Sequence, residues 1–202
     1  MFKPRLARRS LEQYRKKGQG ELERRMVEAA SEGGLAGARV LEIGGGIGTI
    51  QSELLEAGAE RGEVVELVQA WEPYARELAR EKGLDGRTSF RVADVLDDPA
   101  SVEQADVVVM NRVVCCSPDG VQLAGVAARL ATRALVLSFP RDVFWVRGGV
   151  RLVNAGLRLM GRSFRVFAHP REALLAAARA EGLGLVANGR KGPWEFAALE
   201  RT

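Results

Sequence analysis

The hydrophobic positions of the chain follow two different periods. Short aliphatic runs predict strands, and the segments between them, where apolar residues recur every three or four positions, predict helices. The expected strands cover residues 39–43, 62–68, 88–94, 105–111 and 133–140, and the helices between them cover 49–59, 72–83 and 117–132. Strands that alternate with helices at this spacing predict a parallel sheet covered by helices on both faces.

The two ends of the chain depart from this alternation. Residues 10–31 predict a polar helix that is interrupted at Gly-Gln-Gly, and the last segment predicts a helix followed by two strands around "NGRKGP". We therefore expect one domain over residues 1–202. Its parts are an N-terminal helical cap (1–34), a core (35–140), an insertion (141–169), and a last helix with a β-hairpin (170–202).

The composition narrows the classes of function. Lys and Arg outnumber Asp and Glu by 30 to 26, a net charge of +4 that is too small to argue for nucleic acid. The N-terminus lacks the apolar core of a signal peptide, and no apolar run approaches the length of a membrane span. Cys115 and Cys116 are adjacent, which disfavours a disulfide, and a single histidine gives no zinc spacing. We expect a cytoplasmic protein without a metal, and the sequence leaves its oligomeric state open.

Four glycines lie within five positions in "VLEIGGGIG", between the first strand and its helix. Either the backbone approaches a ligand here, or the strand turns tightly into the helix with no ligand nearby. The spacing fits neither G-x-G-x-x-G nor a Walker A loop. It fits E-x-G-x-G-x-G, with Glu42, Gly44, Gly46 and Gly48.

Two carboxylates follow at the ends of the next two strands. Glu66 lies 20 residues beyond Gly46, where an acid can accept hydrogen bonds from the two hydroxyls of a ribose. Asp94 ends the third strand, where its side chain can meet the amino group of an adenine. Each acid alone is also explained as an exposed charge at a strand end. Their register with the glycines favours a nucleoside site.

With these residues the chain resembles the class I S-adenosylmethionine-dependent methyltransferases. "VLEIGGGIG", "VVEL", "VAD" and "ADVVVMNRVV" look like their first four motifs. The resemblance implies a Rossmann-like, doubly wound, mostly parallel seven-stranded sheet with an antiparallel C-terminal strand. It implies S-adenosylmethionine as cofactor. The cofactor-binding residues expected from it are Glu42, Gly44, Gly45, Gly46, Gly48, Glu66, Asp94 and Asn111.

The insertion carries two stripes at helical spacing. Val143, Val146, Val150, Val153, Leu157 and Met160 form an apolar stripe, and Arg147, Arg151, Arg158 and Arg162 form a basic one. Three interpretations stay open. The insertion is a lid whose Arg147 and Arg151 bind an acidic substrate, or a helix on a membrane surface through residues 141–165, or a cover for the sheet edge with a solvated arginine face.

Three residues are candidates for catalysis: His169, whose imidazole is a common general base near neutral pH, Tyr14 in the N-terminal helix, and Cys115 after the fourth strand. Each has a structural alternative, as a helix cap or as packing. "RVVCCSPD" and "FRVFAHP" also resemble, more loosely, the magnesium-protoporphyrin O-methyltransferase branch, which methylates a propionate on a flat apolar macrocycle. That branch carries a histidine near the position of Cys115.

The function expected from these features is methyl transfer to a small molecule that is acidic or partly apolar. Two alternatives stay open. One is a protein that binds S-adenosylmethionine without catalysis, and the other is an RNA methyltransferase that uses the basic N-terminus.

Overall fold

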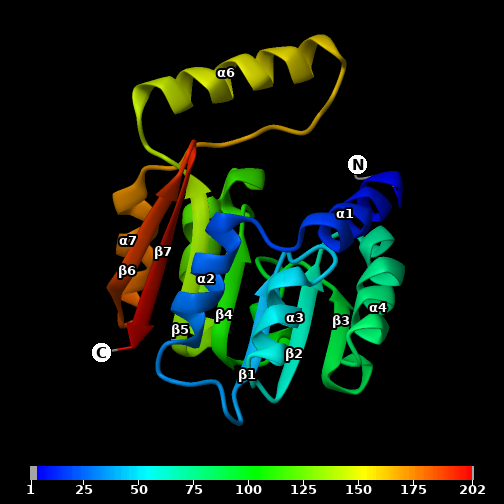
Figure 1. The fold of residues 1–202 in the computed structure, drawn as a ribbon. Helices are drawn as coiled ribbons and strands as arrows, with labels where there is room; N and C mark the ends of the chain where they lie inside the picture. Colours follow the sequence, from blue (N-terminus) through cyan, green and yellow to red (C-terminus); the bar gives the residue numbers. More distant parts are fainter. Residues whose placement is uncertain (1–3, 202) are drawn as a thin grey trace.

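The computed structural model describes residues 4–201, so residues 1–3 of the expected N-terminal cap and Thr202 lie outside the described residues. Its strands form one seven-stranded sheet in the order β3-β2-β1-β4-β5-β7-β6 (Figure 1). The strands are β1 (Arg39–Ile43), β2 (Arg61–Glu66), β3 (Thr88–Val92), β4 (Ala105–Asn111), β5 (Ala131–Pro140), β6 (Leu183–Lys191) and β7 (Trp194–Arg201).

The direction of the strands confirms the expected fold class. Parallel pairs join β1 to β2 and β4, β2 to β3, and β4 to β5. Strand β7 runs antiparallel to both of its neighbours, β5 and β6. The "NGRKGP" segment turns the chain at Gly192, whose φ of 55° is in the left-handed region. The hairpin predicted from the sequence is thus present, and the sheet is mostly parallel with one antiparallel strand.

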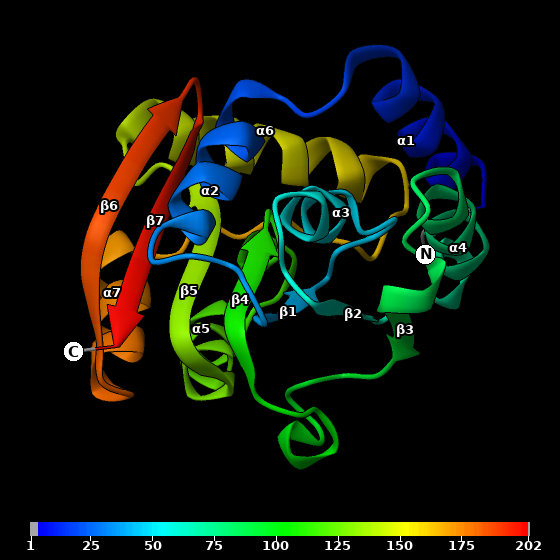
Figure 2. The same ribbon diagram turned by 60° about the horizontal axis from the view of Figure 1, so that its bottom comes forward.

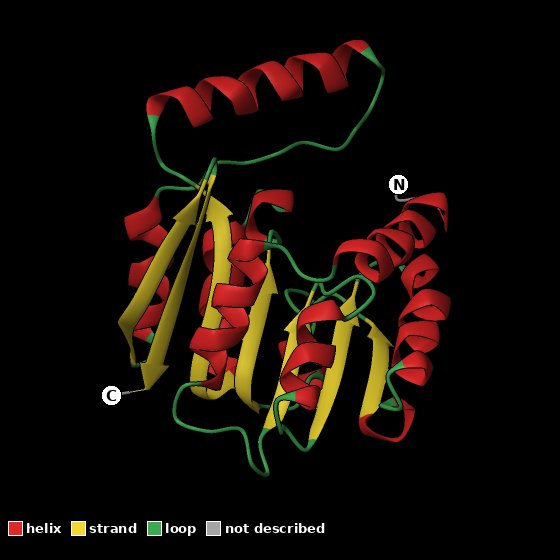
Figure 3. Cartoon of the chain, in the orientation of Figure 1, coloured by secondary structure: helices red, strands yellow, loops and turns green. Residues whose placement is uncertain are grey.

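The helices cover both faces of the sheet, as Figure 3 shows in a cartoon coloured by secondary structure. They are α1 (Pro4–Lys17), α2 (Glu21–Ser31), α3 (Thr49–Glu56), α4 (Glu72–Glu81), α5 (Gly120–Leu130), α6 (Phe144–Leu159) and α7 (Arg171–Ala180). Alternate residues of a strand point to opposite faces, so Val107 and Val109 pack with α2 and α3, whereas Val108 and Met110 pack with α5 and α7. The valine-rich central strands are therefore buried on both sides.

The N-terminal segment differs from the expected single interrupted helix. It forms two helices, and the first begins at Pro4 rather than near residue 10. Gly18, with a φ of 63°, ends α1 through a hydrogen bond from its N–H to the carbonyl of Tyr14. Helix α2 packs on the sheet, whereas α1 lies against α4 (Figure 2).

Residues 141–169, called the arm below, leave the sheet at the carboxyl end of β5. They carry α6 away from the other helices before the chain returns to α7 (Figure 1). Val146 is the buried side chain of α6. Asn154 donates to the carbonyl of Val166 (2.7 Å) and accepts from its N–H (2.8 Å), which ties the helix to its own return segment. Over residues 4–201, no helix is long and apolar enough to cross a bilayer.

Candidate functional site

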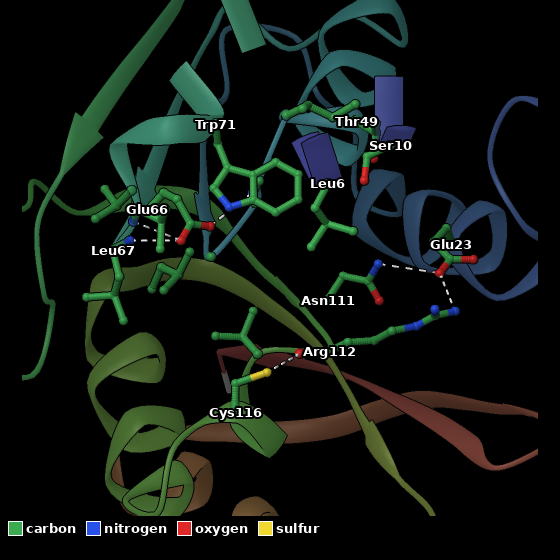
Figure 4. Close-up of a pocket in the computed structure, with 18 of the residues that line it drawn as sticks. Leu6, Ser10, Glu23, Thr49, Glu66, Leu67, Trp71, Asn111, Arg112 and Cys116 are labelled. Carbon is green, nitrogen blue, oxygen red and sulfur yellow. Dashed lines mark hydrogen bonds and ion pairs between the residues drawn. The ribbon is translucent and has the colours of Figure 1, made fainter. Parts of the chain in front are cut away.

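A cavity of about 800 Å³ opens at the carboxyl ends of β1, β2 and β4, beside the residues that follow β3 (Figure 4). This is the edge of a parallel α/β sheet at which ligands bind. Its volume lies in the range of small-molecule and cofactor pockets. Residues of the N-terminal segment also line the cavity, among them Leu6, Ser10, Tyr14, Gln19 and Glu23.

The glycine loop forms one wall of this cavity through Gly44, Gly45 and Gly46. Gly44 has a φ of 64°, and a Cβ there would lie 2.7 Å from Cγ2 of Val113. Gly46 has a φ of 58° and faces the indole of Trp71. The turn itself therefore requires glycine at Gly44, and the same turn exposes backbone to the cavity. Gly48 lies outside the lining, at the start of α3.

Glu42 lies beneath the loop rather than on the cavity wall. Its carboxylate is buried and accepts a hydrogen bond from the backbone N–H of Gln51 (2.9 Å). A Cβ at Gly45 would lie 2.7 Å from its Cδ, so the loop rests directly on this side chain. Burial raises the pKa of Glu42 to about 8. Glu42 thus holds the loop and the first turn of α3 in place.

Glu66 ends β2 and lines the cavity, as Figure 4 shows. Its carboxylate accepts from the backbone N–H groups of Gly46 (3.2 Å), Leu67 (2.9 Å) and Val68 (3.3 Å). Burial raises its pKa, and these hydrogen bonds act in the opposite direction. The carboxylate is therefore fixed in orientation beside the glycine loop, and the remaining lone pairs on its two oxygens can accept from a ligand.

Asp94 and Asn111 lie on the same cavity, at the ends of the neighbouring strands. Oδ1 of Asp94 accepts from the N–H of Leu96 (2.9 Å), which fixes the turn after β3. The amide of Asn111 is held from two sides. Its Oδ1 accepts from Ser138 (2.7 Å), and its Nδ2 donates to Glu23 (3.4 Å).

Tyr14 reaches the cavity from α1, and its hydroxyl donates to Glu53 of α3. Burial and this hydrogen bond raise the pKa of Tyr14 to about 12. The phenol is therefore neutral at physiological pH, and its O–H group is already engaged in a hydrogen bond to the carboxylate of Glu53. In this arrangement Tyr14 joins α1 to α3.

The two cysteines occupy different positions. Cys115 is buried, and its thiol donates to the carbonyl of Arg112 (3.3 Å). The hydrogen bond with Cys116 and burial raise the pKa of the Cys115 thiol. Cys116 lines the cavity, and its hydrogen bond with Cys115 lowers the pKa of its own thiol. The structure thus brings the neighbour of the candidate cysteine to the site.

His169 lies outside the cavity lining. Its Nε2 is 3.0 Å from the carbonyls of Val114 and Ser117, in the turn that follows β4. The ring stacks on Phe167 at a centroid distance of 6.0 Å. The imidazole therefore fastens the base of the arm to this turn, and it provides no cap for α7, whose N-terminal turn begins at Pro170 without a side-chain cap.

Arg147 and Arg151 also lie away from the cavity. Arg147 forms an ion pair with Asp142 (2.5 Å), and both arginines border a separate shallow depression at the start of α6. Within residues 4–201, none of the residues that line the large cavity belongs to the arm. The structure places the two arginines apart from the glycines and acids.

Sequence reasoning missed several residues that line the cavity, among them Gln19, Glu23, Trp71 and Arg112. Arg112 has a φ of 59°, which is rare outside glycine and costs energy. It forms an ion pair with Glu23 (2.7 Å) and packs over the ring of Trp194 at 4.8 Å. Its place directly after Asn111 was the available signal, since residues just beyond a parallel strand face the ligand edge. The sequence contains no such signal for Glu23, because this residue comes from α2, which is distant in sequence.

The family comparison supports the motif assignment. Residues 41–134 match the family model described as a methyltransferase domain. No curated protein sequence matches the chain. This family match covers the loop, both acids and Asn111.

Solved structures with a similar fold are more numerous. Magnesium protoporphyrin IX methyltransferase from Synechocystis, bound to SAH, superposes with a TM-score of 0.71 at 18% identity, over 90% of this chain and 82% of that one. A family 2 O-methyltransferase from Planctomyces limnophilus, in complex with apigenin, gives 0.73 at 17% identity, over 100% and 62%. A TehB-like methyltransferase from Corynebacterium glutamicum gives 0.67 at 16% identity, over 99% and 100%. These likenesses show a shared fold.

Proposed function

We propose that this chain, a class I S-adenosylmethionine-dependent methyltransferase, methylates a small molecule that is acidic or partly apolar. One observation carries the proposal. The glycine loop, Glu66, Asp94 and Asn111 come from four different strand ends and converge on one cavity of about 800 Å³, a volume typical of small-molecule and cofactor pockets. We further propose that residues 1–202 act as one domain, in the cytoplasm.

The residues present fit the cofactor. The glycine loop offers backbone without side chains, and Glu66 offers a fixed carboxylate for a pair of ribose hydroxyls. The amide nitrogen of Gln19 is buried at the cavity wall and has no hydrogen-bond partner among the described residues, so it is free to donate to a ligand. When bound, S-adenosylmethionine supplies an electrophilic methyl group on a sulfonium. The protein's own tasks are then alignment of the acceptor and exclusion of water.

The substrate end of the proposed site is the part of the cavity near Glu23, Arg112 and Cys116. Arg112 is the arginine that lines the cavity, and its ion pair with Glu23 and its contact with Trp194 hold the guanidinium in place. We assign the binding of an acidic group to Arg112, because a guanidinium pairs well with a carboxylate. Leu6, Val113 and Leu123 supply apolar surface in the same cavity.

Two measurements test the proposal. Calorimetry should show micromolar binding of S-adenosylmethionine and S-adenosylhomocysteine and no binding of NAD. The purified chain should then transfer a radiolabelled methyl group from the cofactor to a member of a panel of small carboxylic acids and phenols. The panel includes a magnesium porphyrin, because a magnesium protoporphyrin IX methyltransferase shares the fold.

The outcomes separate the alternatives. Binding of NAD without a response to S-adenosylhomocysteine overturns the cofactor assignment. Cofactor binding with no transfer to any acceptor favours a non-catalytic binding protein. Transfer to total RNA alone favours an RNA methyltransferase. Transfer to a small acid that the Arg112→Gln variant performs with an unchanged KM removes Arg112 from the substrate site.

A further inference from the structure

The outer face of α6 carries a line of exposed apolar side chains. Trp145, Leu152 and Leu159 follow one another at intervals of seven residues, which is two helical turns, so they lie on one face. Leu152 is 75% exposed and Leu159 is 90% exposed, values that are unusual for leucine. Val153 and Met160 extend the same exposed surface.

Arginines run along the helix beside this apolar line. Residues 143–168 contain five arginines, at positions 147, 151, 158, 162 and 165, and no Lys, Asp or Glu. Arg147 pairs with Asp142 at the base of the arm. Among the described residues, no carboxylate forms an ion pair with Arg151, Arg158 or Arg162. Arg147, Arg151 and Arg158 lie in α6, Arg162 follows its end, and all four are exposed, so the exposed surface of this helix is both apolar and strongly basic.

Contacts on the inner side fix the direction in which this surface faces. The two hydrogen bonds between Asn154 and Val166 hold the inner face of α6 against the return segment. The N–H of Phe167 donates to the carbonyl of Cys115 (2.8 Å), and His169 fastens the same base. Helix α6 stands away from the other helices (Figure 1), and the helical period puts the apolar line on the side of α6 opposite Asn154.

We propose that α6 docks this protein on the surface of a bilayer that contains anionic phospholipid. A helix that lies in the interface buries an apolar face at the boundary of headgroups and acyl chains, and its basic residues meet lipid phosphates. Trp145, Leu152 and Leu159 supply the apolar face, and the arginines without an ion pair supply the contacts to lipid phosphates. The inference uses no residue of the cavity, so it stands apart from the proposed function.

Docking through α6 also has a consequence for the cavity. The arm leaves the sheet at the carboxyl end of β5, which is the edge where the cavity lies (Figure 1). A protein held by the outer face of α6 therefore has this edge directed toward the bilayer.

Cosedimentation of the full chain with vesicles tests the proposal. One set consists of phosphatidylcholine alone, and the other contains phosphatidylcholine and phosphatidylglycerol at about three to one, so that its surface is negatively charged. The protein should sediment with the anionic vesicles and should bind the neutral vesicles only weakly. Added salt should weaken the binding, because at 1 M the screening length falls to about 3 Å.

Paired variants locate the binding surface. Arg151→Gln with Arg158→Gln should weaken binding to anionic vesicles by about 30-fold, because each arginine near such a surface contributes about fivefold. Leu152→Gln with Leu159→Gln should weaken it by about tenfold or more. Arg24→Gln with Arg179→Gln is the charge-matched control, and Val92→Gln with Val186→Gln is the apolar control. All four control residues are exposed and lie outside the arm, so both control pairs should bind normally.

Three results would overturn the inference. The protein does not sediment with anionic vesicles, or the α6 variants bind them as well as the controls do, or the α6 variants change the oligomeric state, in which case a second copy covers this face. Thermal melting confirms that each variant is folded. Calorimetry with S-adenosylhomocysteine runs in parallel, because an absent cofactor response with intact vesicle binding refutes the proposed function alone.

Discussion

The glycine loop and the arm are both glycine-containing connections that follow a strand of the same sheet, yet they are built in opposite ways. The loop is supported from below by Glu42, and Glu66 accepts a hydrogen bond from its backbone beside the cavity. The arm is attached at its base, and α6 buries a single side chain, Val146. One connection is thus fixed by dense contacts, and the other presents its side chains to the surroundings. We therefore expect the loop to determine the proposed cofactor site and the arm to provide a surface for contacts with other molecules.

Glu42, which supports the glycine loop, should make the stability of the protein depend on pH. Burial raises the pKa of Glu42 to about 8, so the folded protein keeps a proton that the unfolded chain releases at about pH 4.3. The free energy of unfolding contributed by this group therefore decreases as pH rises between these values, and it does not decrease further above about pH 8. Glu42→Gln removes the decrease.

We expect this variant to match the wild type near pH 4 and to exceed it by several kcal/mol above pH 8, since one pKa unit corresponds to about 1.4 kcal/mol. Urea unfolding across this pH range measures the difference. Glu60→Gln, at an exposed position, is the control. Parallel curves for Glu42→Gln and the wild type would show that the carboxylate is ionised in the fold.

A glycine-to-alanine substitution should change the free energy of unfolding in opposite directions in the two regions. Gly44→Ala places a Cβ on a residue with a φ of 64°, at 2.7 Å from Val113. The left-handed conformation and the clash together should lower the free energy of unfolding by about 3 kcal/mol. Gly148 lies inside α6, where an added Cβ meets no atom within 4 Å apart from its chain neighbours and the adjacent helix backbone, so Gly148→Ala should stabilise the helix by up to about 1 kcal/mol. Thermal melts of the two variants that shift in the same direction would contradict the contrast.

The loop, and not the arm, should set the affinity for the cofactor. Glu66→Ala removes the carboxylate to which we assign the ribose, and such charge-assisted bonds contribute about 1.5–3 kcal/mol, or about tenfold to a hundredfold in affinity. Calorimetry with S-adenosylhomocysteine measures it, with Glu60→Ala as the matched control. A folded Glu66→Ala variant with an unchanged dissociation constant would place the ribose elsewhere.

The sheet and the loop were predictable because their information is local. The strands are continuous aliphatic runs, and Gly44, Gly46 and Glu66 lie at fixed offsets within one βαβ unit. The position of the arm was not predictable from periodicity, because it depends on contacts with distant residues, such as the hydrogen bond from the N–H of Phe167 to the carbonyl of Cys115. Glu23 reaches the cavity from α2 and Gln19 from the connection between α1 and α2, both distant in sequence from the strand ends, so no spacing signals them. Cys115 and Cys116 are neighbours in the sequence, and the conformation of the turn after β4 determines which of them faces the cavity.

The smallest expected effect concerns the coupling between the two regions. Asn154→Ala removes both hydrogen bonds that hold α6 to its return segment, and each contributes about 1 kcal/mol. The arm should open locally more often while the sheet stays intact, because local stability varies across a fold. Hydrogen exchange should therefore become faster in residues 144–168 and stay unchanged over residues 39–66.

The affinity for S-adenosylhomocysteine should remain within about twofold of the wild type, since the cavity is lined by residues outside the arm. Asn188→Ala, on the exposed side of β6, is the control. If Asn154→Ala instead weakens the cofactor affinity severalfold, the arm closes over the site as a lid, and the separation between a fixed loop and an independent arm is wrong.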